Sequence, residues 1–146
     1  MASNMKPSNS ILKLPLYSAI ESLTEYIVTG IINKHMSNFL KETIGKNLLE
    51  LCIEIIRLIP IANRKINTKE ERIKTISLII ENVDLIKINI KLLRKFKCIT
   101  EKKYSVAVGL AADVGRQAQG WINYLEGNDC LNKKNNYSSP FENKKG

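Results

Sequence analysis

Aliphatic residues recur every three or four positions through most of this 146-residue chain, and this period constrains the fold more than any other feature. Such spacing places side chains on one face of an α-helix, whereas a half-buried strand needs a spacing of two. The chain holds only seven glycines and four prolines, too few for the many turns of an all-β fold. The sequence therefore predicts an all-α protein, and its length suffices for one buried core.

Two helical segments are expected in the first half of the chain. The first spans about residues 16–33, and Ser18 and Glu21 have the spacing of a capping box near its start. The second spans about residues 37–59. Pro60 is expected to end it, because proline disfavours a helical conformation in the residue before it.

Two longer helices are expected in the second half. One opens at Thr68 with a capping box that Glu71 completes, and it runs to about residue 97. The other opens with Thr100 as its N-cap and ends near residue 127. Four long helices joined by short loops predict an antiparallel four-helix bundle.

The segments outside these helices have a different composition. Residues 1–14 and 127–146 are rich in Ser, Asn and Lys without a hydrophobic period, which predicts a disordered tail on each side of a bundle over residues 15–126. No signal peptide is expected, because Lys13 and Pro15 interrupt the first apolar stretch. No apolar run is long enough to span a bilayer, and three cysteines without a C-x-x-C pair indicate a reducing, cytoplasmic location.

The predicted third helix has two apolar stripes where a bundle helix normally has one. The first stripe is suited to the core: Ile76, Ile79, Val83, Ile86, Ile90 and Leu93. The second is offset around the axis, and we expect it to be an oligomer interface: Leu78, Leu85, Ile88, Leu92 and Phe96. A contiguous apolar stripe on a surface marks an association site, whereas isolated exposed isoleucines are common. Self-association, or docking on a larger protein, is therefore expected.

The formal net charge is +9, and a surplus of this size attracts polyanions such as nucleic acid. About half of it comes from the predicted tails, which carry a net charge of +4. Many of the other cations form three groups around the third helix: Arg64, Lys65, Lys69, Arg72 and Lys74 near its start, Lys87, Lys91, Arg94 and Lys95 along its second half, and Lys97, Lys102 and Lys103 around the turn that follows it. They predict either a phosphate-binding surface or an ordinary solvated face.

Nothing in the sequence indicates catalysis. The single histidine, His35, lies in a polar loop, where we expect it to face solvent, and carboxylate pairs fit helix caps and surfaces. No phosphate-binding loop, dinucleotide fingerprint or metal-ligand spacing is present, so we expect no enzyme, no cofactor and no metal.

The predicted fourth helix carries small residues on one face: Ala107, Ala111, Gly115 and Ala118. Small side chains allow a neighbouring helix to approach closely, which would explain a glycine inside a helix. Trp121, the only tryptophan, follows one turn later and is expected to be a core anchor.

Residues 99–121, ITEKKYSVAVGLAADVGRQAQGW, resemble the last helix of the Avd family, the accessory variability determinants of diversity-generating retroelements. The family's helix begins with a short acidic-basic cap and an aromatic residue and ends in a D/E-x-G-R-x-x-x-G-W pattern. Residues 39–51 resemble its second helix. The family places are held here by Thr100, Glu101, Lys102, Tyr104, Asp113, Gly115, Arg116, Gly120 and Trp121.

The resemblance implies a four-helix bundle that assembles into a ring or barrel of five subunits. It also implies binding to a reverse transcriptase and its template RNA, or an RNA/DNA hybrid, in support of mutagenic copying. Arg116 would join the basic residues as a contact. Two alternatives stay open: a stand-alone RNA-associated bundle of the ribosomal RNA intervening-sequence type, which the chain also resembles, and a structural protein–protein adaptor.

Overall fold

The computed structural model describes residues 13–127, so most of both predicted tails lies outside the described residues. Helix α2 (Pro15–Tyr26) continues into a π-helical segment, Ile27–Ile31. After a short loop, α3 (Asn38–Leu40), a second π-helical segment (Lys41–Gly45) and α4 (Lys46–Ala62) form one continuous helical stretch. Helices α5 (Lys69–Lys95) and α6 (Glu101–Leu125) are the longest. The all-α prediction is confirmed, since these elements include no strand within residues 13–127.

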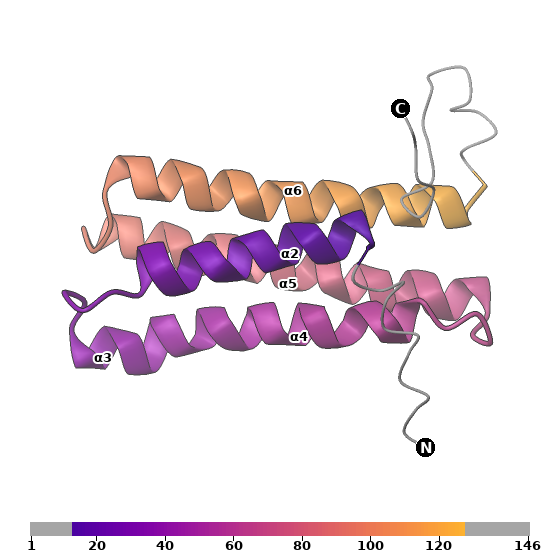
Figure 1. The fold of residues 1–146 in the computed structure, drawn as a ribbon, viewed down its shortest axis with the longest axis horizontal. Helices are drawn as coiled ribbons and strands as arrows, with labels where there is room; N and C mark the ends of the chain where they lie inside the picture. The colour runs from indigo at the N-terminus through magenta and orange to yellow at the C-terminus, as the bar shows by residue number, and fades with distance from the viewer. Residues whose placement is uncertain (1–12, 128–146) are drawn as a thin grey trace.

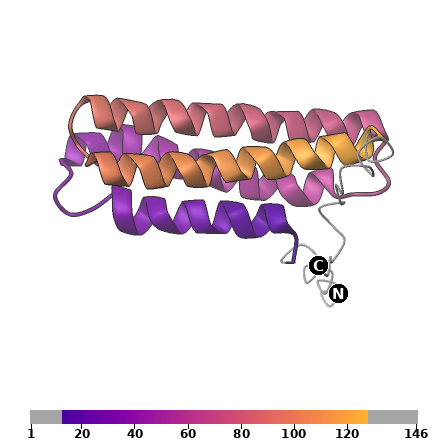
Figure 2. The same cartoon turned by 90° about the horizontal axis from the view of Figure 1, so that it is seen from above.

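The helices lie side by side along their lengths (Figures 1 and 2). Helix α5 packs against α4 and α6, and α2 also packs against both α4 and α6. Each helix therefore has two principal neighbours, and the core lies between all of them. This arrangement leaves one side of every helix facing outward.

The two predicted caps of the longest helices are confirmed. The Thr68 hydroxyl accepts a hydrogen bond from the Glu71 backbone N–H at 3.0 Å, and the Glu71 carboxylate accepts one from the Thr68 N–H at 2.9 Å. The Thr100 hydroxyl accepts from the Lys103 N–H at 3.1 Å. These side chains bind backbone donors that have no partner inside the helix.

The predicted start of α2 is correct to within one residue, but the predicted capping box is wrong. The helix begins at Pro15, with Leu14 as an N-cap that has no side-chain hydrogen bond, so Ser18 and Glu21 lie inside the helix. Proline is well suited to a first helical position, since its missing N–H would be unpaired there in any case. Leu14, assigned to the tail by the sequence, is buried and belongs to the core.

The predicted end of α4 is also wrong, because the helix continues through Pro60 to Ala62. Leu58, Ile59 and Ala62 are buried, and their packing offsets the backbone hydrogen bond that proline cannot donate. The chain leaves the helix at Asn63, whose N–H still bonds to the Ile59 carbonyl at 3.0 Å.

The core stripe predicted for α5 is confirmed, since all six of its residues are buried: Ile76, Ile79, Val83, Ile86, Ile90 and Leu93. From α6, the three alanines of the small-residue face and Trp121 are also buried. The explanation for Gly115 is wrong. A Cβ added there would lie 3.7 Å from Cγ1 of Val83, an ordinary contact, so the packing leaves room for a methyl group.

Candidate nucleic-acid and partner interface

The second stripe of α5 faces outward. Four of its five residues are exposed to between 45% and 55%, and Leu92 is half-buried: Leu78, Leu85, Ile88, Leu92 and Phe96. No other described helix exposes as many large hydrophobic side chains. The structure thus brings the predicted interface residues together along one helix, on the side that the subunit leaves uncovered.

The cations near the start of α5 divide into two kinds. Arg64 and Lys65, in the loop between α4 and α5, are exposed, as are Lys69 and Lys74. Arg72 is half-buried, and its Nε donates a hydrogen bond to the Ala62 carbonyl at 2.8 Å. Its guanidinium therefore caps the C-terminal end of α4, a role that the spacing of residues in the sequence did not predict.

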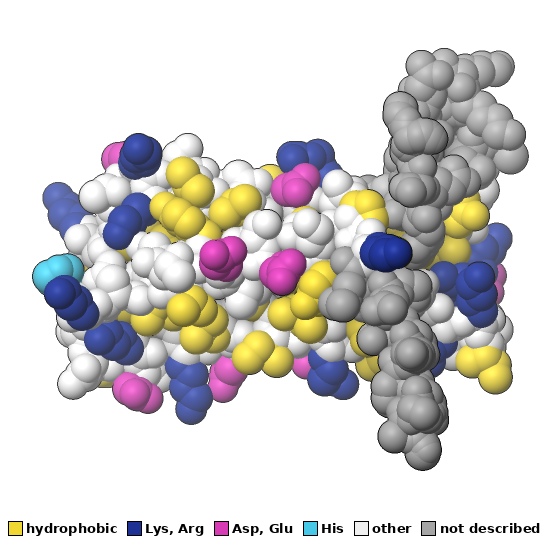
Figure 3. All heavy atoms as spheres, in the orientation of Figure 1, with side chains coloured by type: hydrophobic (Ala, Val, Ile, Leu, Met, Phe, Trp, Pro, Cys, Tyr) yellow, Lys and Arg dark blue, Asp and Glu magenta, His cyan; other side chains and the backbone are white. Residues whose placement is uncertain are grey.

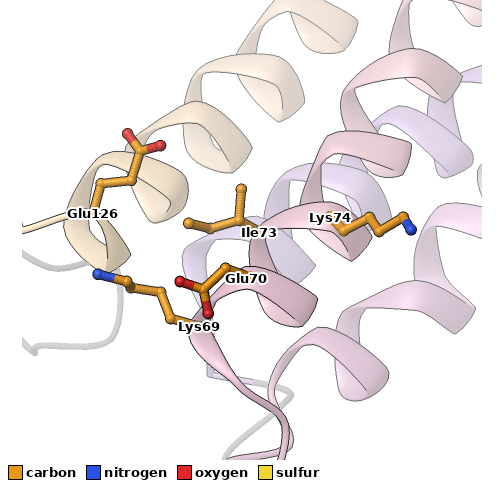
Figure 4. A pocket seen from close by; sticks show the side chains of 5 residues that line it. All are labelled: Lys69, Glu70, Ile73, Lys74 and Glu126. Carbon is orange, nitrogen blue, oxygen red and sulfur yellow. The ribbon is translucent and has the colours of Figure 1, made fainter.

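An open hollow lies between the first turns of α5 and the end of α6 (Figure 4). Ile73 lies in its centre, and side chains of both charges surround it: Lys69, Glu70, Lys74 and Glu126. Because carboxylates accompany the lysines, this hollow does not favour an anion. Arg64 and Lys65 do not line it, so they are the two cations of this group best placed to meet phosphate.

The basic residues of the second half of α5 are also divided. Lys91 and Lys95 are exposed and Lys87 is half-buried. The Arg94 guanidinium lies 4.0 Å from the centre of the Tyr104 ring, and its Nη1 lies 3.5 Å from Oε1 of Glu101. Arg94 thereby links the end of α5 to the first turn of α6, and less of its charge is available to an external phosphate.

Arg116 is held by its own helix. Its Nη2 donates a hydrogen bond to Oδ1 of Asp113 at 3.0 Å, and both residues lie on the outer side of α6. The spacing of three between Asp113 and Arg116 was the signal in the sequence that could have shown this pair.

On the face drawn in Figure 3, basic side chains lie along the edges and at both ends of the molecule. Hydrophobic side chains form separate patches between them. Helix α5 lies behind α2 in this orientation, as Figure 1 shows. On this face the basic side chains are therefore spread out, rather than gathered into a single groove.

The single histidine and the side chains that could bind a metal ion do not gather into one site within the described residues. His35 is exposed and its backbone N–H donates to Oδ1 of Asn33 at 2.8 Å. Among residues 13–127, no three His, Cys, Asp or Glu side chains lie close enough to hold a metal ion. None of the helices in this part of the chain has the length and hydropathy to cross a membrane.

Comparisons of the chain with protein-family models, curated proteins and solved structures find no match.

Proposed function

We propose that this chain is a non-enzymatic accessory protein that binds a reverse transcriptase and its template RNA in a diversity-generating retroelement. Its subunit is an antiparallel four-helix bundle that assembles with copies of itself, for which the Avd resemblance suggests a five-subunit ring or barrel. Assembly places the cations of several subunits on one surface, where they can hold RNA phosphates while the polymerase docks.

The observation that carries this proposal is the exposed stripe of α5. About half of the surface of Leu85, Ile88 and Phe96 faces solvent in a single subunit. A row of large apolar side chains along the outer face of a helix is typical of an association surface. Exposed cations lie at both ends of the same helix, so a subunit held through this stripe also presents positive charge.

RNA binding is tested with Arg64 and Lys65, which lie in a loop away from the stripe. We expect Arg64→Glu/Lys65→Glu to weaken binding to a structured RNA at least tenfold at low salt, and the wild-type affinity to fall steeply with salt concentration. Lys34→Glu/Lys46→Glu is the matched control, because it changes the net charge equally at exposed positions in another part of the chain. Equal affinities of the two variants would contradict a binding role for the loop.

The polymerase contact needs its own experiment, because a stand-alone RNA-associated bundle or a protein adaptor would also expose such a stripe. The genes beside that of this chain should include a reverse transcriptase, and co-expression with that enzyme should yield a complex that survives gel filtration. RNA binding without such a complex would favour the stand-alone bundle. A protein complex without any RNA binding would favour the adaptor.

A further inference from the structure

One flank of the exposed α5 stripe has its charges sorted along the helix. Glu81 and Asp84 come first, Lys91 and Lys95 follow, and all four side chains are exposed. At 3.6 residues per turn these four positions fall within about 80° of one another around the helix axis, beside Ile88. The flank is therefore acidic in its first half and basic in its second half. We call these four residues the charged flank.

No residue of the charged flank forms an ion pair within residues 13–127. The ion pairs among residues 13–127 join Glu54 to Arg57, Arg94 to Glu101 and Asp113 to Arg116, and they include none of its four residues. Four exposed charges beside an exposed apolar stripe have the composition of the rim of an interface, where polar groups surround an apolar centre.

The opposite flank of the stripe differs in kind. Over residues 75–96 it carries the uncharged polar residues Asn82 and Asn89, both half-buried, and no charged residue. This asymmetry distinguishes the two ways in which two α5 helices can pair. In a parallel pair, the charged flank of one helix faces the asparagine flank of the other. In an antiparallel pair, charged flanks face each other, with the acidic half of one beside the basic half of the other.

We infer that the stripe binds the same stripe of a second copy of this chain, with the two α5 helices antiparallel about a twofold axis near residues 86–87. In this register Leu85 lies opposite Ile88 of the second copy, so the centre of the contact is apolar. Glu81 and Asp84 lie level with Lys91 of the second copy to within about 3 Å along the axis, because each residue of a helix rises by about 1.5 Å. Because the axis is twofold, this pairing of opposite charges occurs twice, once towards each end of the apolar contact.

This contact closes after two copies, because a twofold interface uses the same patch on both subunits. A five-subunit ring would need a different surface for its repeating contact. The inference rests on the self-association in the proposed function, but it needs neither RNA nor polymerase. A failure of RNA binding would therefore leave it intact.

The first test is the mass of the purified protein. Light scattering coupled to gel filtration at micromolar concentration should give the wild type twice the mass of a variant that cannot form this contact. The masses are about 33 kDa and 16.6 kDa where the stripe is the only contact between copies, and ten chains and five chains where a five-subunit ring forms through another surface. Leu85→Glu should therefore halve the wild-type mass while far-ultraviolet circular dichroism shows unchanged helix content. A wild-type mass of one chain or of five chains, or a Leu85→Glu protein that keeps the wild-type mass, would overturn the inference.

The orientation is tested by reversing each half of the charged flank. An acidic variant, Lys91→Glu/Lys95→Glu, and a basic variant, Glu81→Lys/Asp84→Lys, each place like charges opposite one another in an antiparallel pair. Each alone should self-associate about tenfold more weakly than the wild type, since facing like charges repel. An equimolar mixture of the two, and a chain carrying all four changes, should recover wild-type association.

The matched control is Lys34→Glu/Lys46→Glu, which changes the net charge as the acidic variant does but lies outside α5. It should associate as the wild type does. If the acidic and basic variants also associated as the wild type does, or if their mixture failed to recover association, the antiparallel register would be excluded. Recovery in the mixture supports it, because a parallel pair would not bring the two reversed flanks together.

Discussion

Gly115 lies on α6 opposite Val83 of α5, where a methyl group would make an ordinary contact. Glycine costs an exposed helix interior about 1 kcal/mol relative to alanine, because it loses more backbone entropy on folding. We therefore expect Gly115→Ala to raise the free energy of unfolding by up to about 1 kcal/mol. Denaturation in urea would measure this. A loss of stability would show that the two helix backbones are closer than the contact with Val83 indicates.

Cys52 is fully buried in α4, and this burial raises the pKa of its thiol from an ordinary 9.0 to about 11. A side-chain hydrogen bond with Thr24 lowers the pKa by a smaller amount. The unfolded chain ionises this thiol first as the pH rises. The contribution of the neutral, buried thiol to the free energy of unfolding is therefore complete below about pH 9. This contribution is lost progressively as the pH rises towards 11. The stability of Cys52→Ala should lack this dependence on pH.

The measurement is the difference in free energy of unfolding between wild type and Cys52→Ala, which cancels the titration of lysines common to both. We expect the difference to change by about 2 kcal/mol between pH 8.5 and pH 11, to the disadvantage of the wild type. A difference independent of pH would contradict the burial of this thiol.

The turn between α5 and α6 is held by side chains of both helices. Arg94 of α5 lies over the ring of Tyr104 and beside the carboxylate of Glu101, both in α6. A cation over an aromatic face contributes about 0.5–1 kcal/mol at an exposed site. Arg94→Gln should therefore lower the free energy of unfolding by about that amount, whereas Tyr104→Phe, which keeps the ring, should change it little. Equal losses in the two variants would assign the contribution to the Tyr104 hydroxyl instead.

The two faces of α5 provide a matched comparison at the same point of one helix. Ile86 is fully buried, and its neighbour Leu85 is 47% exposed in the subunit. Ile86→Ala removes a buried side chain and should cost about 2–5 kcal/mol of stability. Leu85→Ala should cost much less under dilute conditions that favour single subunits. Its effect should appear instead in the concentration at which subunits associate.

Equal stability losses for the two variants in dilute solution would show that the outer stripe is already covered within one subunit. Thermal unfolding at two protein concentrations separates the contributions, since only association makes the midpoint depend on concentration.

At the scale of the whole molecule, the sequence by itself determined the helices, the caps at Thr68 and Thr100, and the division of α5 into two apolar stripes. These features follow from the spacing of residues that are close together in the sequence. The continuation of α4 through Pro60 was not predictable in this way. There, packing of Leu58, Ile59 and Ala62 in the core outweighs the local preference of proline to end a helix.

For the basic residues too, the sequence predicts one part and the tertiary structure decides the other. The sequence located the cations, but only the tertiary structure decided which are already engaged. Arg72 caps the end of α4 and Arg94 stacks on Tyr104 because the fold brings the facing ends of consecutive helices together, and the spacing of residues within one helix predicts neither contact. Arg64, Lys65, Lys91 and Lys95 stay exposed because the fold brings no partner to them within residues 13–127. Periodicity fixes which face of a helix is apolar, whereas packing decides which charges remain available to another molecule.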